Sequence, residues 1–114
     1  MNACKLADKT CIPCSGDVPK LEEGEYRPLL EQLGDGWEVI GGHHLEKTFT
    51  FPDFAEALAF VNRAGAVAEA EAHHPDLHLA WGRVRATVWT HAIDGLAEAD
   101  FILAAKLDAV RSAD

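Results

Sequence analysis

The stretch LHLAWGRVRATVWTHAI, residues 77–93, decides the fold, because it predicts two strands that fold back on each other. The strands cover residues 77–81 and 84–93, and Gly82 lies at the turn between them. Along the second strand, successive side chains point to opposite faces. One face carries Val84, Ala86, Val88 and Thr90, and the other carries Arg83, Arg85, Thr87, Trp89 and His91. This alternation is typical of an antiparallel hairpin with one buried face.

A second hairpin precedes the first along the chain. Residues 37–40 and 44–51 predict two strands, joined by a turn at Gly41-Gly42. In the return strand, apolar Leu45, Phe49 and Phe51 alternate with polar Glu46, Thr48 and Thr50. Because the strands come as hairpins and not as strand–helix–strand crossovers, we expect an antiparallel sheet.

Three helices are predicted around these hairpins, over residues 22–33, 53–72 and 97–111. Asp53 and Glu56 have the spacing of a capping box at the start of the second helix, and Pro75 ends it at or just before His74. The apolar residues expected to face the core are Tyr26, Leu29, Leu30 and Leu33 in the first helix, Phe54, Leu58, Val61, Gly65 and Ala68 in the second, and Phe101, Ile102, Ala105 and Val110 in the third.

The predicted fold class is therefore α+β. It is a four-stranded antiparallel sheet with three helices packed on one face, in the order α-β-β-α-β-β-α. The two sheet edges carry no obvious block to pairing, so we expect the chain to form an oligomer through them.

Composition and charge limit the classes of partner. The 114 residues include 19 acidic and 10 basic side chains, which gives a formal net charge of −9. Such a surface repels nucleic acid and anionic membranes. The sequence contains no apolar run approaching the ~20 residues that span a bilayer, and the N-terminus does not resemble a secretory signal. We expect a soluble cytoplasmic protein.

Residues 1–20 are expected to form an N-terminal arm before a single domain at residues 21–114. The arm contains all three cysteines, Cys4, Cys11 and Cys14. Cys11 and Cys14 have the spacing of a zinc half-site or a redox pair, with Cys4 as a third zinc ligand. A fourth ligand and a second pair are missing, which favours an arm with reduced thiols over metal or redox chemistry.

The chemistry-bearing residues are histidines near the second hairpin. If His73 is still helical, Glu69 lies one turn before it and orients its imidazole. His74 then points elsewhere because the backbone turns at Pro75, and His91 is expected to end a strand close to the same place. No nucleophile and no glycine-rich phosphate loop stand out, so acid–base catalysis without a covalent step remains.

Plainer readings compete with this one. His73-His74-Pro75 also fits a surface loop, His43-His44 a solvated hairpin corner, and His78 a strand residue facing water. A metal site is the sharper rival, with ligands drawn from His73, His74, Asp76, His78 and His91. Because the helix ends before Pro75, His74 and His78 cannot form a helical ligand pair, so we expect no metal.

Several motifs together match one known family. Glu69-x3-His73-His74-Pro75-Asp76, Trp81-Gly82, Thr90-His91 and Gly95-Leu96-x3-Asp100 resemble the signature of the pterin-4a-carbinolamine dehydratases. The likeness extends from about residue 21 to residue 110, and the cysteine-bearing arm resembles bacterial members associated with phenylalanine hydroxylase.

The resemblance implies the loss of water from a 4a-hydroxytetrahydropterin, which gives the quinonoid dihydropterin, without a metal or organic cofactor. It implies His73 and His91 as the acid–base pair and His74 as the residue that holds the pterin. Substrate-binding positions carried over from the family are Glu69, Pro75, Trp37, Thr90 and Asp100. Dimers or tetramers and a functional link to phenylalanine hydroxylase are also implied.

Two positions depart from the family pattern. Leu77 stands where an aromatic residue is common, and Ala97 stands where Ser or Thr often caps the last helix. Two other functions remain open: a non-catalytic dimerisation module, as in animal members that bind a homeodomain transcription factor, and a pterin-handling role in molybdopterin metabolism.

Overall fold

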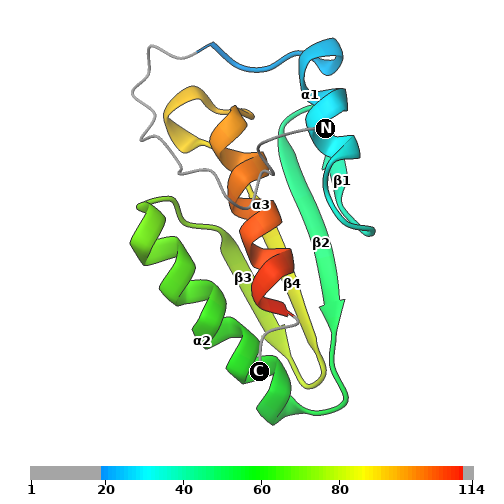
Figure 1. Ribbon diagram of the computed structural model, residues 1–114, viewed down its shortest axis with the longest axis vertical. Coiled ribbons are helices and arrows are strands. Elements are labelled where there is room, and N and C mark those ends of the chain that lie inside the picture. Colours follow the sequence, from blue (N-terminus) through cyan, green and yellow to red (C-terminus); the bar gives the residue numbers. More distant parts are fainter. Residues whose placement is uncertain (1–18, 112–114) are drawn as a thin grey trace, which may run out of the picture.

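The computed structural model describes residues 19–111, and the three cysteines lie outside that range. Three helices and four strands follow one another in the predicted order (Figure 1). A short 3-10 turn, η2, is inserted before the last helix. The elements are α1 Glu23–Glu31, β1 Glu38–Ile40, β2 His44–Thr50, α2 Phe54–Glu71, β3 Asp76–Ala80, β4 Arg83–Val88, η2 His91–Ile93 and α3 Glu98–Arg111.

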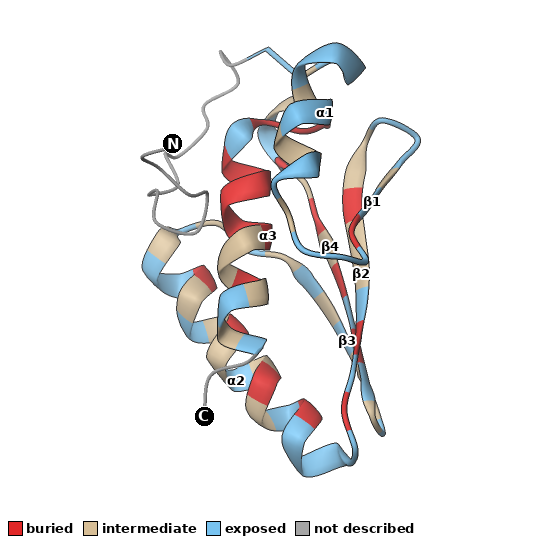
Figure 2. Cartoon of the chain, turned by 45° about the vertical axis from the view of Figure 1, so that its right-hand side comes forward, coloured by how far each residue is buried: buried red, intermediate tan, exposed pale blue. Residues whose placement is uncertain are grey.

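All neighbouring strands are antiparallel, and their order in the sheet is β1-β2-β4-β3. The three helices lie on one side of this sheet (Figures 1 and 2). The two hairpins are thus joined through β2 and β4, and β1 and β3 are the edge strands. The predicted α+β fold class and its element order are confirmed.

The Gly41-Gly42 turn forms as predicted, with φ of 60° and 68° at the two glycines. Left-handed backbone of this kind is what a tight hairpin turn requires, and glycine adopts it without steric cost. The turn matters for the site because it brings His43 and His44 to the beginning of β2.

The core fills the space between the sheet and the helices. Figure 2 shows buried residues along α3 and along the inner strands. The largest fully buried apolar side chains are Phe49, Phe60, Phe101, Leu45, Leu96, Leu103, Leu107, Val84 and Val88. The alternation predicted for β2 and β4 is confirmed, because Leu45, Phe49, Val84, Ala86 and Val88 are all buried.

The face of α2 that enters the core differs in part from the predicted one. Phe54 and Leu58 are 44% and 40% exposed, whereas Ala57, Phe60 and Ala64 are buried. Ala68 is buried as predicted. The helix is apolar on more than one side, so periodicity alone does not select the inner face. Small alanines allow α2 to pack closely on α3, and Phe60 fills the space next to Phe49 and Phe51.

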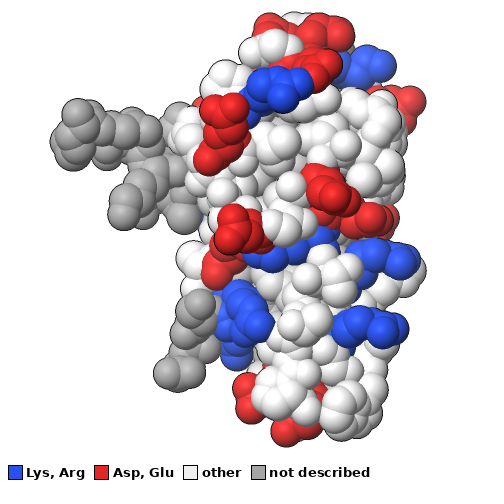
Figure 3. Space-filling model, turned by 90° about the vertical axis from the view of Figure 1, so that its right-hand side faces the viewer, with Lys and Arg blue, Asp and Glu red and all other residues white. Residues whose placement is uncertain are grey.

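The surface carries both signs of charge. Figure 3 shows acidic and basic side chains interspersed on the face it presents, without a continuous basic stripe. Among the described helices, none is long and apolar enough to cross a bilayer.

Candidate active site

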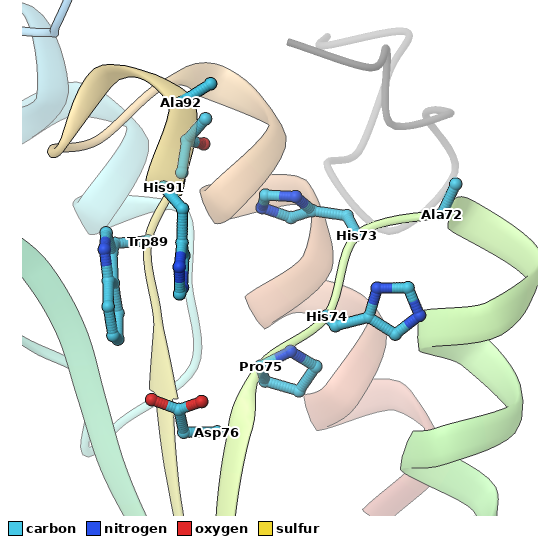
Figure 4. A pocket seen from close by; sticks show the side chains of 9 residues that line it. Ala72, His73, His74, Pro75, Asp76, Trp89, His91 and Ala92 are labelled. Atoms are coloured by element: carbon cyan, nitrogen blue, oxygen red, sulfur yellow. The ribbon is translucent and has the colours of Figure 1, made fainter.

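A cavity of about 410 Å³ opens where the end of α2 meets the end of β4 (Figure 4). One wall comes from the connection between α2 and β3, and the other from the segment between β4 and η2. The lining residues are Ala72, His73, His74, Pro75, Asp76, Trp89, Thr90, His91 and Ala92. The three predicted site histidines, which lie in two segments separated by β3 and β4, therefore meet at one cavity.

The end of α2 places the first two histidines. The helix stops at Glu71, and Ala72 takes the left-handed conformation with φ of 55°. The backbone N–H of His73 then donates to the carbonyl of Ala68 at 3.2 Å, a bond that closes the helix end. His73 is consequently outside the helix, and the reversal at Ala72 sends His73 and His74 in different directions (Figure 4).

His73 is held by Asp100 and not by Glu69, so the predicted Glu69–His73 pairing is wrong. The Nε2 atom of His73 lies 2.6 Å from Oδ1 of Asp100. Helical i, i+4 geometry is lost because Ala72 ends the helix one residue too early for the expected contact. Glu69 contacts His74 instead, with its Oε2 2.6 Å from Nε2 of His74.

Asp100 is a fully buried carboxylate on which three groups converge. Besides the bond to His73, its Oδ2 accepts hydrogen bonds from the Thr90 hydroxyl and the Ala97 backbone N–H, both at 2.8 Å. An ionised carboxylate only accepts, so the proton of His73 lies on Nε2. Among residues 19–111, no side chain is hydrogen-bonded to the Nδ1 atom of His73.

The pair formed by His74 and Glu69 has a different environment. Their side chains are 58% and 80% exposed, so solvent screens the interaction. The bond orients the His74 ring, while the His73–Asp100 pair lies in a low-dielectric interior where the interaction is stronger. The two adjacent histidines thus have distinct supports.

The alternation predicted that His91 ends a strand, and this prediction is wrong. β4 stops at Val88, Thr90 forms an isolated bridge with Gly95, and His91 begins the 3-10 turn η2. Asp94 closes this turn in the left-handed conformation with φ of 51°. The tight loop lifts His91 out of the sheet and towards the cavity wall (Figure 4).

Trp89 lines the cavity, whereas Trp37, which was predicted to line it, does not. Trp37, expected to line the site, is buried against Phe49, and its indole N–H donates to Asp108 at 3.0 Å. Trp89 lines the cavity instead and stacks on the His91 ring, with centroids 4.2 Å apart and planes 8° from parallel. The sequence held a signal for this contact, because Trp89 and His91 share one face of the predicted strand.

His43 is more than a solvated hairpin corner. Its Nε2 atom lies 2.7 Å from Oδ1 of Asp94, and its ring packs near Trp89. The hydrogen bond from His43, followed by the positive charge of the same ring, lowers the pKa of Asp94 below its ordinary value. The hairpin turn is thereby linked to the loop that carries His91.

Two further predicted positions lie away from the cavity. His78 is exposed on the outer face of the sheet, where it lines a second hollow with Thr48, Arg83 and Arg85. Leu77 is half-buried and packs against the core. Within residues 19–111, no group of three or more His, Cys, Asp or Glu side chains is arranged to hold a metal ion.

One family model and several proteins of related sequence match most of the chain. A family model described as pterin 4 alpha carbinolamine dehydratase matches residues 19–110. A protein named "Putative pterin-4-alpha-carbinolamine dehydratase" from Rubrobacter xylanophilus is 54% identical over 104 residues, covering 91% of this chain and 96% of its own. A relative with the same name from Rickettsia bellii is 50% identical over 109 residues, covering 96% of both chains.

Two solved structures are also similar. A transcriptional coactivator/pterin dehydratase from Brucella melitensis has a TM-score of 0.76 at 36% identity, covering 82% of this chain and 99% of its own. A pterin dehydratase-like protein, described as a RuBisCO assembly factor of the α-carboxysome, has a TM-score of 0.60 at 26% identity, covering 69% and 93%.

Proposed function

The chain belongs to the pterin-4a-carbinolamine dehydratase family, and we propose that it dehydrates a 4a-hydroxytetrahydropterin to the quinonoid dihydropterin. The observation that carries the proposal is the meeting of His73, His74 and His91 at one cavity. The cavity volume of about 410 Å³ lies in the range of ligand pockets, roughly 300–1,000 Å³. A flat bicyclic pterin suits such a space.

The reaction needs two proton transfers. The bond between C4a and the hydroxyl oxygen breaks, a ring nitrogen loses its proton, and one molecule of water leaves. One group must protonate the departing hydroxyl, and another must accept the proton from the ring. Imidazoles suit both steps because they exchange protons near neutral pH, and each transfer accelerates such reactions by about 10²- to 10⁴-fold.

We assign the proton transfers to His73 and His91, which approach the cavity from opposite walls. Asp100 supports His73 by holding the Nε2 proton and by stabilising the imidazolium that forms when Nδ1 takes a second proton. His74, oriented by Glu69, holds the pterin, and Pro75 and Thr90 complete the surface around it. The assignment needs no metal or organic cofactor.

The cellular role follows from the reaction. Reduction of the quinonoid product would return tetrahydropterin to an aromatic amino acid hydroxylase, and phenylalanine hydroxylase is the hydroxylase we infer. We further propose a cytoplasmic location and a homodimer or homotetramer that associates through the exposed sheet edges, β1 and β3.

The test is to generate the 4a-hydroxytetrahydropterin enzymatically and to follow its decay by absorbance with and without the purified chain. The proposal expects a faster decay that is proportional to protein concentration. An unchanged decay would refute the dehydratase activity. That outcome would favour a non-catalytic or pterin-handling role, a reading to which the RuBisCO assembly factor among the similar structures lends weight.

A further inference from the structure

The three cavity histidines are held in different ways. Asp100 accepts a hydrogen bond from His73, and Glu69 accepts one from His74. Within the part of the chain that the structure describes, no hydrogen bond joins the His91 ring to another side chain. Its closest ring neighbour is Trp89, stacked at 4.2 Å and 8°. His91 is also exposed, and the bond from the Asp94 N–H to the His91 carbonyl fixes the turn but not the rotation of the side chain.

We propose that Trp89 is a positioning residue for His91: the stacked indole sets the plane in which the imidazole meets the substrate. The inference rests on the proposed dehydration, because it gives a role to a residue that lines the same cavity. Face-to-face contact of aromatic rings fixes the relative orientation of two planes without hydrogen bonds. Rings in this arrangement also shield each other from water on one side.

The stacking has a chemical consequence for His91. A carboxylate partner would occupy one ring nitrogen, as Asp100 does at His73. The Trp89 contact occupies a ring face instead, so no side chain among residues 19–111 takes up a nitrogen of His91, and both can meet the substrate or water. A proton taken from the substrate at one nitrogen can therefore leave from the other, which suits a group that must be reset in every turnover.

Trp89 also contacts two other rings, which restrict its position. The rings of His43 and His44 lie 5.4 Å and 6.0 Å from it, in tilted contact. The bond between His43 and Asp94 ties the same hairpin to the end of the His91 turn at 2.7 Å. Trp89 and the turn thus share one support, which keeps the indole against the imidazole.

The experiment compares Trp89→Phe and Trp89→Leu with the wild type, and uses Trp81→Leu as the control. Trp81 is 68% exposed at the β3–β4 turn and lines no part of the cavity. Two readouts are needed: kcat and KM for dehydration, and the NMR shifts of the carbon-bound ring protons of His91. Those protons are identified by their loss in His91→Asn, and a stacked indole moves them upfield through its ring current.

The proposal expects an upfield shift of the His91 ring protons in the wild type, relative to those of His78. In Trp89→Leu the shift disappears and kcat falls about 10- to 100-fold at nearly constant KM, as expected when a reacting group is misplaced. Trp89→Phe retains a stacked ring and recovers most of both signals. Trp81→Leu behaves as the wild type in both readouts.

Three results would overturn the inference: wild-type His91 protons without an upfield shift, a Trp89→Leu protein with wild-type kcat, or a rise in KM alone. The last would mean that Trp89 contacts only the substrate. The wild-type spectrum decides the stacking even if Trp89→Leu fails to fold. Failure of the proposed function is distinguishable, because it abolishes dehydration in the wild type and leaves the His91 shifts intact.

Discussion

Asp100 is the residue around which the site is organised. Its carboxylate is fully buried and connects the start of α3, through Ala97, with Thr90 and His73. A buried charge is costly unless several donors satisfy it, and here three do. The same carboxylate therefore holds the fold at the end of β4 and fixes the proton of a proposed catalytic imidazole.

Replacing Asp100 by Asn should lower both activity and stability. The amide nitrogen can face Nε2 of His73 only if that nitrogen loses its proton, which reverses the tautomer. We expect kcat to fall by about 10²-fold or more. The free energy of unfolding should fall by about 1–3 kcal/mol, since buried donors lose a charged acceptor.

Glu69→Gln is the matched control for Asp100→Asn, because it changes a carboxylate that holds the neighbouring histidine at an exposed position. Its effect on the free energy of unfolding should stay within about 0.5 kcal/mol. Steady-state kinetics and urea unfolding check both variants. If Asp100→Asn and Glu69→Gln lost equal amounts of kcat and of unfolding free energy, Asp100 would have no special part in the site.

The link between His43 and Asp94 predicts a pH effect at the turn that carries His91. The pKa of Asp94 is lowered by the hydrogen bond and the charge of His43. A lowered carboxyl pKa favours the folded state above the unfolded-state value of about 3.9, and this contribution disappears as the pH falls through the folded-state pKa. Carboxyl carbon NMR should show an Asp94 midpoint below that of an ordinary aspartate.

His43→Ala should raise the Asp94 midpoint towards its ordinary value. His78→Ala is the control, because His78 lies on the outer face of the sheet with Arg83 and Arg85. An Asp94 midpoint that is the same in all three proteins would mean that the contact does not form in solution.

At residue level, the sequence predicted three histidines that do line one cavity, but it predicted a wrong carboxylate partner for His73. His73, His74 and His91 meet at one cavity as expected, but Glu69 contacts His74 and Asp100 contacts His73. A single left-handed residue, Ala72, makes the difference. Alanine rarely takes this conformation, so nothing in the local sequence indicated it.

Among the elements, the C-terminal end of α2 has the largest influence on the site. The helix could have continued through His73, but the reversal at Ala72 directs the two histidines apart. A non-glycine residue pays roughly 1–2 kcal/mol for left-handed backbone. This end of the helix is therefore a strained position that serves the cavity.

Ala72→Gly should stabilise the protein. The substitution removes the steric cost at φ 55° and adds a smaller entropy cost in the unfolded chain. We expect the free energy of unfolding to rise by about 0.5–1 kcal/mol, measured by urea denaturation. Ala70→Gly, at an exposed position inside the same helix, should lower it by about 0.5–1 kcal/mol. A lower free energy of unfolding in both variants would contradict the claim that Ala72 is strained.

Two elements show the limits of periodicity. The predicted core stripe of α2 includes Phe54 and Leu58, which are exposed, because the helix is apolar on two sides and the sheet selects only one. β4 was expected to continue to Ile93, but the Thr90–Gly95 bridge closes a loop after Val88. Both outcomes depend on tertiary contacts that a local pattern does not contain.

For the whole molecule, the sequence predicted the element order, the antiparallel hairpins and the one-sided helix layer. Each of these depends on strong local signals: the alternation in residues 44–51 and 84–88, the Gly41-Gly42 turn and the Asp53 cap, which accepts from Glu56 N–H at 2.9 Å. The sheet order β1-β2-β4-β3 could not be derived in this way, since it arises from pairing between the two hairpins.

The sheet edges predict association of copies. β1 and β3 each have one unpaired side within residues 19–111, and β3 begins at Asp76 in the cavity wall. We expect light scattering after size-exclusion chromatography to give a dimer or tetramer at micromolar concentration. Ile40→Lys places a positive charge on the β1 edge, and His78→Lys places one on the β3 edge. If copies pair through one of these edges, the variant at that edge should have a lower molar mass than the wild type, because like charges then face each other. A monomeric wild type would contradict the proposed association.

The central claim is that the cavity between α2 and the His91 turn carries the dehydration. The most direct measurement is kcat/KM for 4a-hydroxytetrahydropterin in His73→Ala, His91→Ala and His78→Ala, with the fold of each checked by circular dichroism. The kcat/KM of His73→Ala and that of His91→Ala should each be about 10²-fold or more below the wild-type value, as expected when a proton-transfer group is removed. His78→Ala, which alters a histidine outside the cavity, should retain wild-type activity. Equal activity in all three variants would contradict the account.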